Sequence, residues 1–194
     1  MRPGRDDGLT RIGSETTMAA MMTQRLFLRT GLAVLALLLG WTASAYGQSF
    51  ERLGDFNDWS AFRFTENGSK ACFMASQPIN HEGNYKERGD IYALVTHWPA
   101  DNTRDEVSIV IGYKFQDDSF VDLSIGGQKF KLFTRDDVAW TPNATEDGRL
   151  VKAMIKGAKM GVRGTSWRGT KTKDTYSLKG FTAAYKKINE ICGS

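Results

Sequence analysis

The chain has 194 residues, 41% of them hydrophobic, and a formal net charge of +4, a composition that is typical of a globular protein and excludes a fibrous or fully disordered one. Residues 1–45 hold five arginines against three acidic residues, so residues 46–194 carry a net charge of about +2. A charge this small gives no support for a nucleic-acid partner, and we expect none.

The first 45 residues have the features of an N-terminal extension and a cleavable signal peptide. Arg25 and Arg29 precede the apolar run 32–39, and Ala43-Ser44-Ala45 supplies the small residues that signal peptidase requires. The apolar run is shorter than the ~20 residues of a membrane-spanning helix. No later stretch is apolar enough either, so we expect no transmembrane segment after cleavage.

Export would leave a single mature domain, 46–194. We predict cleavage after Ala45, with Gly47 as the alternative, and translation that starts at Met21 or Met22, which gives a signal peptide of usual length. Such a protein would reside in the periplasm or be secreted.

Short strand-like segments separated by turn residues dominate the mature chain. The pairs Asn67-Gly68 and Gly126-Gly127 are typical of hairpin loops, and residues 79–89 lack periodicity and are predicted to form a loop. Hairpins exclude a parallel α/β sheet here, because that sheet needs a helix between successive strands. We therefore predict an antiparallel β-sandwich or barrel. Its strands are expected at 59–65, 71–77, 90–97, 106–112, 119–125, 128–134, 159–167 and 175–178.

Two amphipathic segments predict short α-helices at about 145–157 and 180–192. The first begins at the capping residue Thr145 and ends at Gly157, where a C-cap glycine belongs. The second follows Gly180 and ends at Cys192. Its apolar residues recur at helical spacing and are expected to pack on the sheet: Phe181, Ala184, Tyr185, Ile188 and Ile191.

The chain contains two cysteines, Cys72 and Cys192. Exported proteins meet an oxidising environment, so we predict a disulfide that joins the front of the mature domain to its last helix. In the chain-entropy account, closing a loop of this length stabilises the fold by roughly 4–5 kcal/mol. Two separate buried thiols are the alternative.

A basic stretch runs from Lys152 to Lys173, and no acidic residue interrupts it before Asp174. Alternate strand positions would place several of its cations on one face beside Trp167, which predicts a patch that attracts anionic ligands. A solvated face that only aids solubility is the alternative. The candidate residues are Lys156, Lys159, Arg163, Arg168, Lys171 and Lys173.

The tripeptide Arg88-Gly89-Asp90 has the sequence of an integrin-binding motif. On an exposed loop it would make the protein adhesive. The alternative is that Gly89 bends the chain into a strand that begins at Asp90.

Catalytic and metal-binding signals are weak. The two histidines, His81 and His97, belong to no zinc or hydrolase motif, and His97 is predicted to be structural. The acidic pairs Asp117-Asp118 and Asp136-Asp137 occupy turn positions, which aspartate favours, and neither pair has the ligand spacing of a calcium loop. We expect no cofactor, no metal and no enzymatic activity.

Motifs spread over most of the mature domain share a known pattern. The segment 88–97, the hairpin Gly126-Gly127-Gln128-Lys129-Phe130 and the closing segment 169–185 resemble the invasion-associated locus B family of exported bacterial proteins. The resemblance implies an immunoglobulin-like β-sandwich from a Gram-negative bacterium and a link to host-cell invasion, with no enzymatic activity attributed to the family.

These observations together predict an exported, monomeric envelope or host-interaction factor. Its partners would be host-surface or bacterial envelope components. The alternatives are a structural periplasmic envelope protein and an enzyme whose active site combines distant residues. A pocket in which His97 meets a serine or an aspartate would favour the enzyme.

Overall fold

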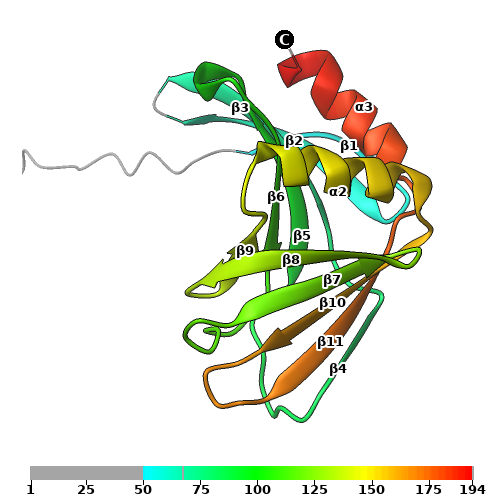
Figure 1. Cartoon of the computed structure of the whole chain (residues 1–194). Coiled ribbons are helices and arrows are strands. Elements are labelled where there is room, and N and C mark those ends of the chain that lie inside the picture. The colour runs from blue at the N-terminus through cyan, green and yellow to red at the C-terminus, as the bar shows by residue number, and fades with distance from the viewer. Residues whose placement is uncertain (1–49, 67, 194) are drawn as a thin grey trace, which may run out of the picture. The chain divides into compact units, whose positions relative to one another are not determined.

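A computed structural model describes residues 50–66 and 68–193, and in them eleven strands form one sheet in which every pair is antiparallel (Figure 1). The strand order across the sheet is β1-β2-β3-β5-β6-β9-β8-β7-β10-β11-β4. The strands are β1 (Glu51–Phe56), β2 (Trp59–Glu66), β3 (Ser69–Ser76), β4 (Asn80–Gly83), β5 (Tyr92–Trp98), β6 (Thr103–Val110), β7 (Phe120–Ile125), β8 (Gln128–Arg135), β9 (Val138–Trp140), β10 (Lys159–Thr165) and β11 (Lys171–Ser177). The predicted mainly antiparallel β class is therefore confirmed.

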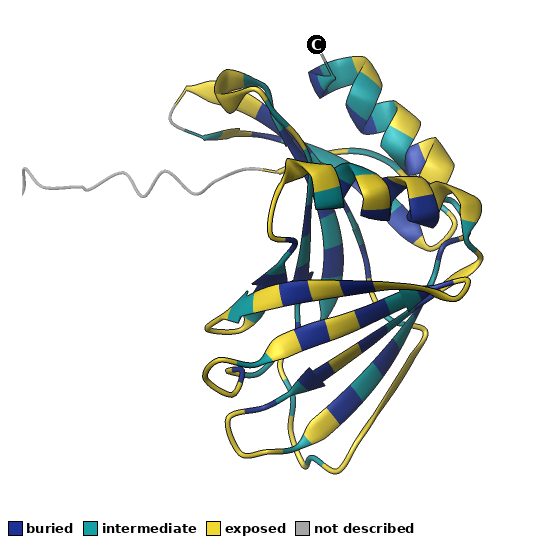
Figure 2. Cartoon of the chain, in the orientation of Figure 1, coloured by how far each residue is buried: buried dark blue, intermediate teal, exposed yellow. Residues whose placement is uncertain are grey.

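The sheet is arranged in two layers. Figure 1 shows β3, β5 and β6 in one layer and β7, β8, β10 and β11 in a second layer that crosses it, with the short strand β9 pairing with both β6 and β8. Buried and exposed residues alternate along the second layer (Figure 2). Side chains from both layers and both helices meet in one core that includes Trp59, Ile109, Leu123, Leu150 and Phe181, each at most 1% exposed.

Three strands lie where no strand was predicted. β4 forms within the predicted loop 79–89 and pairs with β11, although all four of its residues are exposed and none is strongly apolar. β1 precedes the first predicted strand, and β9 has only three residues. Backbone pairing to a neighbouring strand creates these elements, and a period-2 hydrophobic pattern cannot reveal pairing of that kind.

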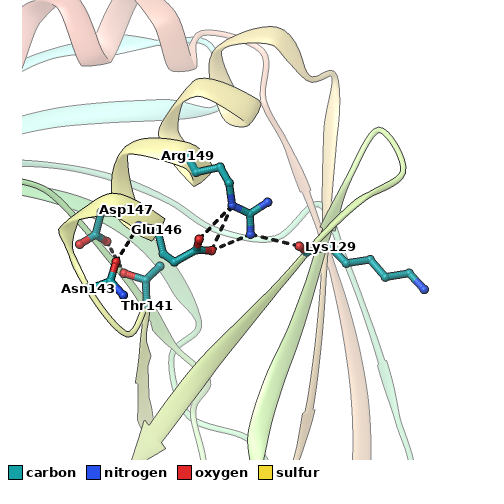
Figure 3. Close-up of polar contacts among 6 residues, drawn as sticks. All are labelled: Lys129, Thr141, Asn143, Glu146, Asp147 and Arg149. Atoms are coloured by element: carbon teal, nitrogen blue, oxygen red, sulfur yellow. Dashed lines mark hydrogen bonds and ion pairs between the residues drawn. The ribbon is translucent and has the colours of Figure 1, made fainter.

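Helix α2 (Ala144–Lys156) confirms the first predicted helix, but its N-cap is Asn143. Figure 3 shows the Asn143 side chain accepting a hydrogen bond from the Glu146 N–H at 3.0 Å. Asp147, buried against the sheet, accepts the Thr141 hydroxyl at 2.6 Å and the Val107 N–H at 2.9 Å. Burial raises the pKa of Asp147. These bonds fix the start of α2 on β6.

The exposed side of α2 is tied to the second layer. Arg149 pairs with Glu146 at 2.6 Å and donates to the Lys129 carbonyl of β8 at 3.3 Å (Figure 3). The Arg149 guanidinium also lies 3.9 Å from the centroid of the Phe130 ring. Helix α2 therefore contacts both layers.

Helix α3 (Phe181–Cys192) confirms the second predicted helix and packs on β1, β2, β3 and β5. Phe181 meets the Trp59 ring edge-on at 4.9 Å, and the Trp59 indole donates to the Ser177 carbonyl at 3.0 Å. The predicted disulfide joins Cys72 of β3 to Cys192, and both residues are buried. The bond therefore fixes the end of the chain to the first layer.

The predicted N-terminal extension and signal peptide, residues 1–45, lie outside the described residues. Within residues 50–66 and 68–193, no helix is long and apolar enough to cross a membrane.

Candidate ligand-binding site

A cavity of about 690 Å³ opens where three chain segments meet, and we call it the Trp167 pocket. Its walls come from the segment after β4, from the segment after β6, and from the turn between β10 and β11. The residues that line it are 84–87, Tyr113, Lys114, 166–168, Thr170 and Thr172.

Backbone hydrogen bonds outside the named strands hold these segments together. The Gly89 N–H donates to the Gly112 carbonyl at 2.9 Å, and the Trp167 N–H donates to the Lys114 carbonyl at 2.9 Å. Gly112 has a φ of +77°, and a Cβ there would lie 2.5 Å from the Gly89 carbonyl oxygen. Only glycine permits both this conformation and this approach of the two backbones.

A buried ion pair lies behind the pocket. The Arg88 guanidinium donates two hydrogen bonds to Asp174 of β11, at 2.7 and 2.6 Å, and a third to the Ile111 carbonyl at 2.7 Å. The Arg88 and Asp174 side chains are 3% and 0% exposed. The rings of Tyr85 and Tyr113 lie 5.5 and 5.1 Å from the guanidinium carbon. The pair therefore positions two of the aromatic walls.

Aromatic surface and hydroxyl groups share the interior of the pocket. The Trp167 indole is 59% exposed, with the Arg168 guanidinium 4.7 Å from its ring centroid. The Tyr113 and Thr172 hydroxyls are 2.6 Å apart, and burial raises the pKa of Tyr113, so its phenol stays neutral at physiological pH. The pocket can therefore bind a ligand through both apolar contact and hydrogen bonds.

The rim of the pocket is cationic. Lys86, Lys114 and Arg168 are exposed around it, and Glu87 is the acidic residue among the lining groups. The lining residues therefore have a formal charge of +2, so an anionic ligand is attracted.

The environment of Arg88 favours a structural role for the tripeptide Arg88-Gly89-Asp90 over the adhesive one. Integrin-type recognition needs an exposed guanidinium, whereas Arg88 is buried against Asp174. The tripeptide instead joins the pocket segment to the start of β5. Its arginine is a structural residue.

The structure divides the predicted basic patch. Lys159, Arg163, Lys171 and Lys173 share the outward face of β10 and β11, because the residues between them are buried. Arg168 lies at the Trp167 pocket, and Lys156 ends α2.

Acidic neighbours flank the two central cations of the outward face. Arg163 pairs in register with Asp122 of β7, and Lys173 forms an ion pair with Glu82 of β4 at 3.2 Å. The six candidate cations therefore do not form one uninterrupted basic surface. The cations around the Trp167 pocket are a more compact group.

His97 is buried, as a structural histidine would be, and does not line the Trp167 pocket. Its Nδ1 accepts the Asp105 N–H at 3.1 Å, and its ring meets the Tyr185 ring edge-on at 5.8 Å. Cys72 is its cross-strand neighbour on β3. This position is inside the packing of α3 on the sheet, away from the Trp167 pocket.

Stability should depend on pH through His97. Burial lowers the pKa of His97 below its ordinary value of 6.5, and the Arg104 charge adds to the effect, although Asp105 opposes it. As the pH falls through about 6.5, the unfolded chain binds a proton that the folded protein excludes, so the free energy of unfolding decreases. Urea unfolding at several pH values measures this decrease.

The variant His97→Asn is the matched control, because the amide oxygen can replace the Nδ1 acceptor and does not titrate. We expect the wild type to lose more stability than His97→Asn between pH 7.5 and 5.5, by at most ~1.4 kcal/mol per pH unit. Parallel pH profiles for the two proteins would contradict this role of His97.

In the described part of the chain, no group of three or more His, Cys, Asp or Glu side chains could hold a metal ion. The two acidic pairs lie in turns, and Asp118 and Asp136 have positive φ values of 55° and 51°, as expected for turn positions.

Comparison of the chain with known proteins gives one family match and one match to a solved structure. The family profile described as "Invasion associated locus B (IalB) protein" matches residues 59–189. The crystal structure of invasion associated protein B from Bartonella henselae has a TM-score of 0.51 at 18% identity, covering 74% of this chain and 96% of that one. At this identity the likeness shows a shared fold. No curated protein sequence matches the chain.

Proposed function

Because the chain belongs to the invasion associated locus B family, we propose that it is an exported, non-enzymatic factor that binds envelope or host-surface molecules. The observation that carries this proposal is the Trp167 pocket, where aromatic walls and a cationic rim meet on the surface. The side chains that line the pocket include aromatic rings, hydroxyl groups and cations, which suit ligand binding, and no histidine or cysteine is among them.

Export is supported by two features of the chain. The predicted signal peptide occupies residues 1–45, and the buried disulfide between Cys72 and Cys192 needs an oxidising compartment to form. The mature domain, 46–194, would therefore fold in the periplasm or outside the cell. We propose that it acts there as a monomer.

We also propose a fold subclass and a biological role for the protein. We class the two-layered antiparallel sheet as an immunoglobulin-like sandwich, and the support for this subclass is the sequence resemblance. We also propose a contribution to host-cell invasion. Its support is that the names of the family and of the Bartonella henselae protein both mention invasion.

Site-specific photo-crosslinking in the producing cell tests the proposal. A photoreactive amino acid replaces Asn84, an exposed residue of the pocket wall, and the matched control carries it at Ile155, which is exposed on α2 and does not line the pocket. After irradiation, the cells are separated into cytosolic, periplasmic and external fractions.

We expect the mature chain in the periplasmic or external fraction, with crosslinked products from position 84 only. Retention in the cytosol would contradict export. Equal crosslinking from both positions would contradict binding through the pocket, and no product from either position would favour a purely structural envelope protein.

A further inference from the structure

We propose that the Trp167 pocket binds an acidic saccharide, meaning a sugar that carries a carboxylate or a phosphate group. This inference rests on the proposed function and specifies its ligand class. It combines three properties of the pocket, namely exposed aromatic surface, spare hydroxyl donors and rim cations.

The aromatic surface suits the apolar face of a sugar ring. A pyranose presents a row of C–H groups on one face, and such groups pack well on a flat aromatic ring. Tyr85, Tyr113 and Trp167 all line the cavity, and Trp167 is exposed over more than half of its surface. Tyr and Trp combine an apolar ring with a polar O–H or N–H, so they are suited to ligands that have both apolar and solvated polar groups.

The pocket also holds hydroxyl groups with unused hydrogen-bonding capacity. The Tyr113 and Thr172 hydroxyls bond to each other, so one of their two protons is used and the other is free for a ligand. The Ser166 hydroxyl accepts the Thr170 N–H at 3.2 Å, and its own proton is free. Thr172 and Ser166 are only 4% and 7% exposed, so their positions are fixed by packing.

The rim cations specify the charge of the ligand. Lys86, Lys114 and Arg168 are exposed, and none of the described ion pairs includes them. Arg88 contributes no free charge, because Asp174 neutralises it behind the pocket. A carboxylate or phosphate at the rim would therefore gain charge-assisted hydrogen bonds that a neutral sugar lacks.

An acidic peptide fits this site less well. A peptide strand would need unpaired backbone groups at the pocket wall. Here the N–H groups of Ser166 and Trp167 already donate to the carbonyls of Thr170 and Lys114, both at 2.9 Å. Recognition at this wall therefore uses side chains, which favours a ligand with hydroxyl groups and an apolar ring face.

Binding titrations of the mature domain with defined probes test the inference. 3′-Sialyllactose represents a host-surface source, a disaccharide of 3-deoxy-octulosonic acid represents a bacterial envelope source, and lactose is the neutral counterpart. Tri-glutamate represents an acidic peptide. Each probe is titrated against the wild type, Trp167→Ala, Lys114→Gln and the control Phe50→Ala, another exposed aromatic residue that lies outside the pocket.

We expect at least one acidic saccharide to bind more tightly than lactose and tri-glutamate. The acidic saccharide that binds identifies the source of the ligand as the host surface or the bacterial envelope. Trp167→Ala should weaken this binding roughly tenfold, and Phe50→Ala should leave it unchanged. Lys114→Gln should reduce both the affinity and its dependence on salt.

Three results would overturn the inference. The first is the absence of binding to both acidic saccharides, and the second is binding that Trp167→Ala and Phe50→Ala affect equally. Preferential binding of tri-glutamate would assign the pocket to acidic peptides and would also overturn it. In each case the crosslinking experiment at position 84 still reports independently on the proposed function.

Discussion

Replacing Cys192 with serine is expected to lower the free energy of unfolding by roughly 2–5 kcal/mol. Cys72 and Cys192 are 120 positions apart, so the bond closes most of the mature domain into one loop and strongly restricts the unfolded chain. It also holds α3 on β3. Urea unfolding of the oxidised wild type and of the variant measures the difference.

The matched controls are Cys72→Ser and the double variant with both cysteines replaced. Each single variant already breaks the bond, so the double variant should differ little from either one. The reduced wild type should behave like the variants. An unchanged unfolding midpoint in Cys192→Ser would contradict the claim that this bond closes the fold.

Breaking the buried ion pair with Asp174→Asn is expected to destabilise the protein by roughly 3–5 kcal/mol. The Arg88 guanidinium would lose its charged partner in a site where its side chain is 3% exposed. Tyr85 and Tyr113 pack on this guanidinium, so we also expect weaker binding of saccharide probes. Urea unfolding and probe titration give the two readouts.

Glu82→Gln is the control, because it breaks the exposed pair with Lys173 on the adjacent strands β4 and β11. Exposed pairs contribute at most about 1 kcal/mol, so this variant should be nearly neutral. The double variant Arg88→Met with Asp174→Leu should recover part of the loss, because no charge is left buried. Equal effects of Asp174→Asn and Glu82→Gln would contradict the importance of the buried pair.

The sequence was sufficient to predict elements with a strong local pattern. β7 and β8 alternate buried and exposed residues around a Gly-Gly turn, and both helices repeat apolar residues at helical spacing. β4 could not be predicted because its four residues are polar and exposed, and only pairing with β11 makes it a strand.

The candidate site was predicted only in part. Arg168 belongs to the predicted basic patch and Trp167 lies beside it, but Tyr85 and Tyr113 belong to separate segments and form no local motif. The ion pair of Arg88 could not be predicted, because its partner, Asp174, is 86 positions away. Its burial depends on tertiary packing, which a tripeptide match cannot reveal.

The most direct test of the proposed site follows the tryptophan indole N–H signals by nuclear magnetic resonance during titration with the acidic saccharides. The mature domain carries four tryptophans, Trp59, Trp98, Trp140 and Trp167, and only Trp167 lines the pocket. We predict that the Trp167 signal shifts with saturation while the buried Trp59 signal stays fixed. A saturating shift at any other tryptophan with Trp167 unchanged would contradict the assignment of the pocket as the ligand site.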